Sequence, residues 1–211
     1  MKGLTLSSYY SSKKSLFTYL IVGIVASILF TFMNPIMTCF LPMIFLISPV
    51  TDNIKHEKDS KWMYYVSTLP KGRSAYVNSY FIFYGVLILI GLIIGVIPLA
   101  LITQNLNLTL VSMLIGIGGA GSYAIMFPLT FKFGPENSNV ILITTSFIVI
   151  ALFFLVFFGF IMPILASSGS IEGIANLTSN LLVVSTYALL GIILLIVSYI
   201  SSIKIFNKQE L

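Results

Sequence analysis

Charged side chains are scarce in this sequence. Only 8% of its 211 residues are charged, whereas 58% are hydrophobic. A soluble domain carries about 25% charged and about 45–50% apolar residues, so an ordinary soluble protein is excluded. An intrinsically disordered chain is excluded as well, because such chains are rich in charge and poor in aromatic residues. Long apolar runs fill most of the sequence instead, and they predict an integral membrane protein.

Cysteine and histidine each occur once, which limits the chemistry available to this chain. Cys39 lies in an apolar run and has no second cysteine for an intramolecular disulfide. His56 lies in a charged segment, so no zinc site and no Ser-His-Asp set can be assembled. The P-loop pattern G-x-x-x-x-G-K-[ST] is also absent from the sequence. We therefore expect no enzyme activity, metal or cofactor in this chain, with any ATP and Mg²⁺ bound by a partner subunit.

Six apolar runs are long enough to cross a membrane, and they predict an all-α fold in a single domain of residues 1–211. A spanning backbone must satisfy its own hydrogen bonds, and these runs lack the alternation of barrel strands. Pro42 and Pro49 predict a kinked or broken second span. The approximate spans are residues 16–33, 36–51, 77–102, 109–131, 140–166 and 181–203.

The distribution of basic residues predicts the orientation of these spans. Six spans put both termini on the same side as the 52–76 and 132–139 segments. All eleven Lys and Arg residues then fall on this side, and the other side carries only Glu172 as a charge. Cytoplasmic segments are enriched in Lys and Arg, so we expect both termini in the cytoplasm. The Lys-rich composition favours a bacterial cell membrane, and the net charge of +5 reflects topology and not nucleic-acid binding.

Glycines cluster in the third and fourth predicted spans. Small residues at these spacings let helix backbones approach closely. Helix packing within the chain is the simplest interpretation, and a subunit interface or a moving hinge is the alternative. The glycines concerned are Gly91, Gly95, Gly116, Gly118, Gly119 and Gly121.

The 52–76 segment predicts a short amphipathic helix outside the membrane. Asp59 or Ser60 is a suitable N-cap, and Pro70 stops the helix. Such a helix either lies flat in the lipid interface or inserts into a groove of a cytoplasmic partner, and periodicity alone does not decide between the two. Its apolar face, at i, i+3, i+4 and i+7, consists of Trp62, Tyr65, Val66 and Leu69.

Three motifs are similar to those of the small bacterial ABC type-2 exporter permeases. The first is WMYYVSTLPKGR at 62–73 with YVNSY at 76–80, where that family has a tryptophan, a Thr-Leu-Pro, a basic residue and a Val-x-x-x-Tyr. The second is FPLTFKFGPE at 127–136, and the third is MKGL at 1–4 with the later Lys13-Lys14 pair. Glu57 and Asp59, separated by one lysine, stand for the usual acidic pair before the tryptophan. The resemblance covers essentially the whole chain.

The resemblance implies that the short helix is a coupling helix docking on an ATP-hydrolysing subunit. The implied contact combines the apolar face with Asp59 as its cap and with Lys71 and Arg73 as charged rim residues. Implied partners are ABC ATPase subunits and a second permease chain, in a homodimer or heterodimer surrounded by membrane lipids. A second, smaller cytoplasmic contact is implied for Lys132, Gly134, Pro135 and Glu136.

We therefore predict the membrane permease of an ATP-driven ABC exporter. Apolar and aromatic walls favour a hydrophobic or amphipathic cargo, such as a peptide, a lipid or a drug. The resemblance extends to staphylococcal exporters of amphipathic peptide toxins. The alternative is a non-transporting scaffold or immunity protein whose 52–76 segment recruits a partner or lies in the lipid interface.

Overall fold

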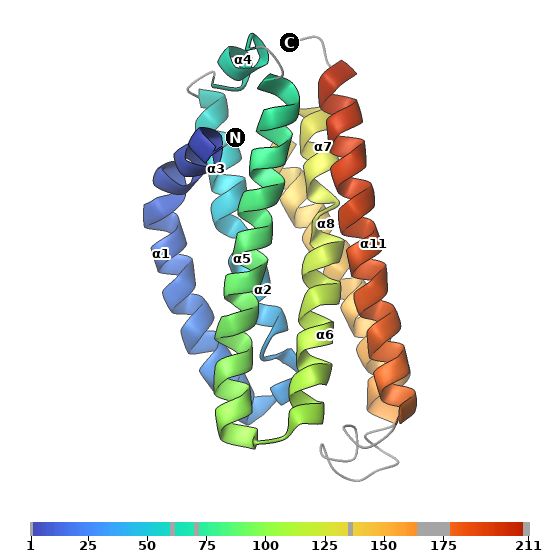
Figure 1. The fold of residues 1–211 in the computed structure, drawn as a ribbon. Coiled ribbons are helices and arrows are strands. Elements are labelled where there is room, and N and C mark those ends of the chain that lie inside the picture. The colour runs from blue at the N-terminus through green and yellow to red at the C-terminus, as the bar shows by residue number, and fades with distance from the viewer. Residues whose placement is uncertain (1, 60–61, 70–71, 135–136, 164–177, 209–211) are drawn as a thin grey trace.

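The chain forms a bundle of long helices that run roughly side by side (Figure 1). This computed structural model describes residues 2–59, 62–69, 72–134, 137–163 and 178–208, and no strand occurs within those ranges. The elements are, in chain order, α1 (Lys2–Met33), η1 (Pro35–Met37), α2 (Phe40–Phe45), α3 (Ser48–Asp59), α4 (Trp62–Ser67), α5 (Gly72–Thr103), α6 (Leu106–Tyr123), α7 (Met126–Phe133), α8 (Ser138–Val156), η3 (Phe157–Ile161) and α11 (Thr178–Lys208).

Six helical segments of the described chain are long and apolar enough to cross a membrane, which confirms the all-α, six-span prediction. The second and fourth segments form the interior, because 67% and 72% of their most apolar stretches are buried, against 22% or 28% for the other four. The six segments are Gly3–Met33, Pro35–Ile54, Gly72–Thr103, Leu106–Phe133, Ser138–Ile161 and Leu181–Lys208.

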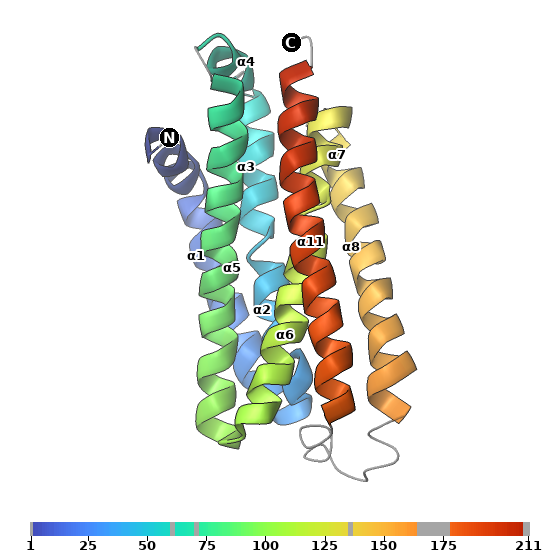
Figure 2. The ribbon, with the colours of Figure 1, turned by 45° about the vertical axis from the view of Figure 1, so that its right-hand side comes forward.

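The first helix extends well beyond its apolar run, since α1 begins at Lys2 and not near residue 16. Within its polar first turns, the Ser8 hydroxyl donates to the Leu4 carbonyl at 3.2 Å and the Ser12 hydroxyl to the Ser8 carbonyl at 2.7 Å. These bonds satisfy the serine hydroxyls inside a helix. The first turns lie at an angle to the bundle axis, whereas the run from Leu16 onward follows the bundle (Figure 2).

The two interior segments are both broken. The second consists of η1, α2 and α3, with Pro42 inside α2 and Pro49 in the first turn of α3, in line with the break that these prolines predict. The fourth is divided into α6 and α7 at Ala124 and Ile125. Pro128 lies in the first turn of α7, where its missing N–H leaves no helical hydrogen bond unmade.

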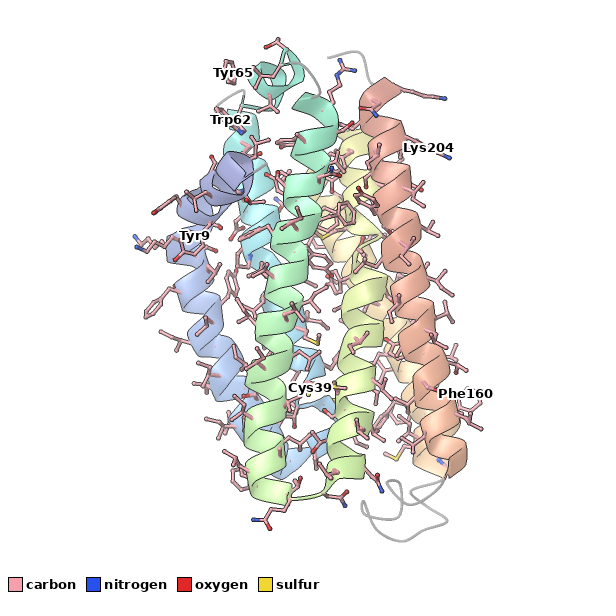
Figure 3. The ribbon with its side chains drawn as sticks, in the orientation of Figure 1. Tyr9, Cys39, Trp62, Tyr65, Phe160 and Lys204 are labelled. Atoms are coloured by element: carbon pink, nitrogen blue, oxygen red, sulfur yellow. The ribbon has the colours of Figure 1, made fainter. Side chains whose placement is uncertain are left out.

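Charged residues mark one end of the bundle. No charged residue occurs between Lys14 and Asp52, or between Arg73 and Lys132. Each of these uncharged stretches covers two spans, so it leaves from one end of the bundle and returns to it. Lys14 and Asp52 accordingly line the same pocket, and Lys204 lies in the half of the molecule that carries α4 (Figure 3). We refer to this end as the basic end.

Glycines allow the interior helices to approach one another. A Cβ on Gly95 would lie 2.6 Å from the Cα of Cys39, and one on Gly121 would lie 2.3 Å from the carbonyl oxygen of Gly191. The first contact joins α5 to the broken second span, and the second joins α6 to α11, which runs beside it (Figure 2). Added Cβ atoms would meet other parts of the same chain within about 3 Å at all six predicted positions: Gly91, Gly95, Gly116, Gly118, Gly119 and Gly121.

Candidate coupling site at the basic end

A short helix lies outside the six spans, in the part of the chain where periodicity predicts one. α4 occupies the basic end of the bundle and contacts both α3 and α5 (Figure 1). Its last turn closes with a bond from the Leu69 N–H to the Val66 carbonyl at 3.2 Å. The Thr68 hydroxyl also donates to the Tyr65 carbonyl, at 2.8 Å. α4 is therefore held at the end of the bundle and is not an isolated helix.

The predicted apolar face of α4 is divided between the bundle and the exterior. Val66 is only 1% exposed and belongs to the core, so it anchors the helix and offers no surface to a partner. Tyr65 is 57% exposed and Leu69 43% exposed. Trp62 is half-buried, and its ring centroid lies 5.4 Å from that of Tyr65. The surface open to a partner, which we name the α4 surface, consists of Trp62, Tyr65 and Leu69. Figure 3 labels Trp62 and Tyr65.

Gly72 places α4 directly against the start of α5. A Cβ at this position would lie 1.9 Å from the carbonyl oxygen of Val66, a distance that no side chain can occupy. The Gly72 N–H donates to the carbonyl of Leu69 at 2.8 Å. Any residue other than glycine would therefore push α4 away from its present position. The sequence contains this glycine between Lys71 and Arg73, but only the structure reveals its contact.

The rim residues implied for the coupling contact have different positions. The Arg73 guanidinium donates to the carbonyl of Asn207 at 3.0 Å, which joins the start of α5 to the last turn of α11. Basic side chains favour this position, because the final carbonyls of a helix carry partial negative charge. Asp59 is the last residue of α3. Its side chain and Lys71 lie outside the described part of the chain.

The second implied contact also lies at the basic end, at the end of α7. Gly134 ends this helix with φ of 83°, which glycine adopts readily. Lys132 is exposed, with its Nζ 5.3 Å from the ring centroid of Phe133. Pro135 and Glu136 lie outside the described residues.

A buried carboxylate lies close to α4, at a residue that the resemblance treats only as one of an acidic pair. Glu57 is 6% exposed, and its carboxylate accepts a bond from the Tyr76 hydroxyl at 2.6 Å and one from the Asn53 amide at 3.2 Å. Burial raises the pKa of Glu57 above its usual 4.5, and hydrogen bonds from Tyr76, Tyr80 and Asn53 partly offset this rise. The residues described include no group of three His, Cys, Asp or Glu that could hold a metal ion.

The Asn53 amide also donates to the Tyr80 hydroxyl, at 3.1 Å. Asn53, Glu57, Tyr76 and Tyr80 thus form a polar cluster, here named the Glu57 cluster, between α3 and α5. Each helix contributes two residues spaced i, i+4, which share one helix face. That spacing was the available signal in the sequence, although it does not reveal that the two faces meet.

Aromatic rings connect the Glu57 cluster to two further helices. The Tyr76 ring stacks on Phe206 of α11 with centroids 5.4 Å apart and lies edge-on to Phe131 of α7 at 6.3 Å. Phe131 and Phe206 are themselves 5.3 Å apart. Such pairs stabilise a core by about 0.5–1.5 kcal/mol beyond their burial. The cluster therefore joins four helices at the basic end, immediately beside α4.

Six apolar helices, with a short helix fixed to one end of their bundle, define a multi-pass membrane protein. Residues 3–207 match the ABC-2 family transporter proteins, and the chain belongs to this family. It is accordingly a membrane permease component of an ABC transporter, and its family works with an ABC ATPase subunit. Comparison with curated proteins and with solved structures gave no significant match.

Proposed function

We propose that this chain is the permease subunit of an ABC exporter and that the α4 surface docks on the ATPase subunit. The observation that carries this proposal is the division of α4 into a buried anchor and an exposed aromatic face. Val66 is 1% exposed while Tyr65 is 57% exposed. Exposed aromatic side chains at this end of the bundle offer an apolar surface to a partner protein. Aromatic residues of this kind dominate the energy of protein interfaces.

Movement of the docked ATPase would reach the membrane spans by two adjacent routes. The first is direct contact, because the backbone of Val66 lies against Gly72 at the start of α5. The second is the Glu57 cluster, which ties α3 to α5 through the 2.6 Å bond between Tyr76 and Glu57. A push on α4 then shifts the second and third spans together. Rigid-body motions of this sort are a common form of switching between states.

The proposed cargo is hydrophobic or amphipathic. None of the six predicted apolar runs contains a charged residue, so they offer no charge to a polar solute inside the membrane. Pathways for ions and polar solutes usually contain such charges inside the membrane. The interior of a single bundle is filled by its own second and fourth spans. We therefore place the pathway between two permease chains.

The basic end faces the cytoplasm in this proposal. Lys and Arg are enriched in cytoplasmic segments, and ATP is available on that side. The α4 surface and the end of α7 both lie at the basic end (Figure 1). Both would therefore face the same ATPase subunit.

The proposal is tested by solubilising the tagged chain gently from its native membrane and identifying the proteins that co-purify. We expect an ABC ATPase in fixed ratio to the permease. Tyr65→Ala should weaken its retention at least about tenfold, because a central aromatic anchor contributes 2 kcal/mol or more, roughly, to binding. Phe160→Ala is the matched control, since Phe160 is 48% exposed and lies in the opposite half of the molecule (Figure 3). Retention of the ATPase by Tyr65→Ala at the wild-type level would contradict the assignment.

A further inference from the structure

Two adjoining pockets open along the first half of α1, and α4 contributes no residue to either. The first is polar, has a volume of about 380 Å³ and includes Ser12, Lys14, Thr18 and Asp52 in its lining. The second is larger, at about 600 Å³, and includes Tyr9, Lys13, Phe17 and Leu20. Ser11 and Lys14 line both pockets, so the two adjoin along the helix.

The polar pocket lies at the level where the chain enters the membrane. Lys14 and Asp52 are the two charged residues that bound the first pair of spans, and both line this pocket. Tyr9 and Tyr10, 40% and 65% exposed, lie on the neighbouring turns. Tyrosine and lysine concentrate at this depth because their polar ends reach the lipid headgroups. A group bound in the polar pocket would therefore lie among the lipid headgroups.

The hydrogen bonds inside the polar pocket restrict the chemistry of its occupant. The Ser12 hydroxyl donates to the Ser8 carbonyl at 2.7 Å, and the Thr18 hydroxyl donates to the Lys14 carbonyl at 3.2 Å. The Ser15 hydroxyl donates to the Asp52 carboxylate at 2.8 Å. Since these protons are engaged, the three hydroxyls can only accept further bonds. These three hydroxyl oxygens therefore match an occupant that carries hydrogen-bond donors of its own.

Charge adds a second restriction on the occupant. Lys13 and Lys14 contribute two positive charges to the pockets, whereas Asp52 contributes one negative charge. The net positive charge matches the single negative charge of a phosphodiester. Apolar Phe17 and Leu20, beside the lysines, match an acyl chain. These features together describe an anionic amphiphile whose headgroup carries hydroxyl groups.

We propose that the two pockets form a binding site for one anionic phospholipid of the phosphatidylglycerol class. The phosphate lies between the ammonium groups of Lys13 and Lys14. The headgroup hydroxyls donate to the oxygen atoms of Ser12 and Asp52, and an acyl chain follows Phe17. The lipid site depends on the proposed function in one respect: the orientation proposed there places the site in the cytoplasmic leaflet. Lipid binding itself needs no ATPase.

The test uses the purified full chain without an ATPase, in detergent, with phosphatidylglycerol and phosphatidylethanolamine added in equal amounts. Native mass spectrometry should find phosphatidylglycerol retained in preference. Lys14→Gln should weaken its retention about fivefold, the effect of removing one lysine from an anionic lipid surface. Lys204→Gln is the matched control, because Lys204 is an exposed lysine at the basic end that lines neither pocket. Equal retention of the two lipids, or equal loss in the two variants, would overturn the proposal.

Two further measurements keep the test decisive, one with a replacement variant and one with competing phosphates. If Lys14→Gln does not give a monodisperse protein, Lys13→Gln takes its place. This variant removes the other positive charge of the site, since Lys13 lines the larger pocket. Inorganic phosphate and glycerol phosphate, added in excess, should leave the lipid bound. Release of the lipid by either would assign the site to a free phosphate and would overturn the lipid proposal. Since no ATPase is present, failure here leaves the docking of α4 unaffected.

Discussion

The Tyr76 hydroxyl donates a 2.6 Å hydrogen bond to the buried carboxylate of Glu57, and these two residues lie on either side of α4 in the sequence. The bond therefore closes the base of the loop that carries the α4 surface. The Asn53–Tyr80 bond and the contacts of Val66 and Gly72 hold the same loop. A closed base allows a force applied at Tyr65 to move α3 and α5 together. This relationship connects the proposed docking surface to the membrane spans.

Tyr76→Phe removes this bond and leaves the ring in place. We expect a loss of stability of about 2 kcal/mol, because a buried carboxylate loses one of its donors. Thermal unfolding of the purified chain measures the effect. Tyr10→Phe is the control, since Tyr10 is 65% exposed on α1. Equal unfolding temperatures for wild type and Tyr76→Phe would show that the bond contributes nothing to stability.

The buried carboxylate of Glu57 should also make stability depend on pH. Burial raises the pKa of Glu57 above 4.5, so the folded chain binds this proton more tightly than the unfolded chain. Above the folded-state pKa, the buried negative charge of Glu57 lowers the free energy of unfolding. This destabilisation disappears as pH falls through the folded-state pKa toward 4.5. The unfolding temperature of wild type should therefore rise relative to that of Glu57→Gln as pH is lowered from neutral. Parallel curves for the two proteins would contradict the role of Glu57.

Gly72→Ala should displace α4. The added Cβ would lie 1.9 Å from the carbonyl oxygen of Val66, so the backbone must move. Overpacking of this kind costs about 1–3 kcal/mol. We expect weaker retention of the ATPase in co-purification, together with a lower unfolding temperature. Gly85→Ala is a control on the same helix, because a Cβ there would meet nothing within 4 Å. If both variants bind the ATPase alike, contact with Gly72 does not position α4.

The orientation can be tested with single cysteines. Cys39 is fully buried, so the native thiol contributes little background to surface labelling. Lys204 lies at the basic end (Figure 3), whereas Leu106, which is 78% exposed, begins α6 at the opposite end (Figure 1). In intact cells, a membrane-impermeant maleimide should label Leu106→Cys and should label Lys204→Cys only after permeabilisation. The reverse pattern would put the basic end outside the cell.

The sequence predicts the six spans because apolar length is a local property, and Pro42 predicts the broken second span for the same reason. The break between α6 and α7 was not predicted. Its one signal, Pro128, is equally compatible with the end of a continuous helix. Gly191 was also missed, because an isolated glycine forms no motif until its contact with Gly121 is known.

The candidate site was only partly predictable. Periodicity places Val66 and Tyr65 on one face, but which of them is buried depends on how α4 rests on α5. Glu57 was interpreted as one of the acidic residues of a loop, because a charged residue between spans is usually solvated. Its burial follows from the approach of Tyr76, which lies beyond α4 in the chain. No local pattern records such an approach.

Photo-crosslinking in native membranes shows directly whether the α4 surface docks on an ABC ATPase. A photoreactive amino acid replaces Tyr65, which is 57% exposed, or Phe160, which is 48% exposed in the opposite half of the molecule. Docking of α4 on the ATPase predicts that the probe at Tyr65 crosslinks to the ATPase subunit and that the probe at Phe160 does not. Crosslinking of the Tyr65 probe to lipid alone, or equal crosslinking at both positions, would contradict it.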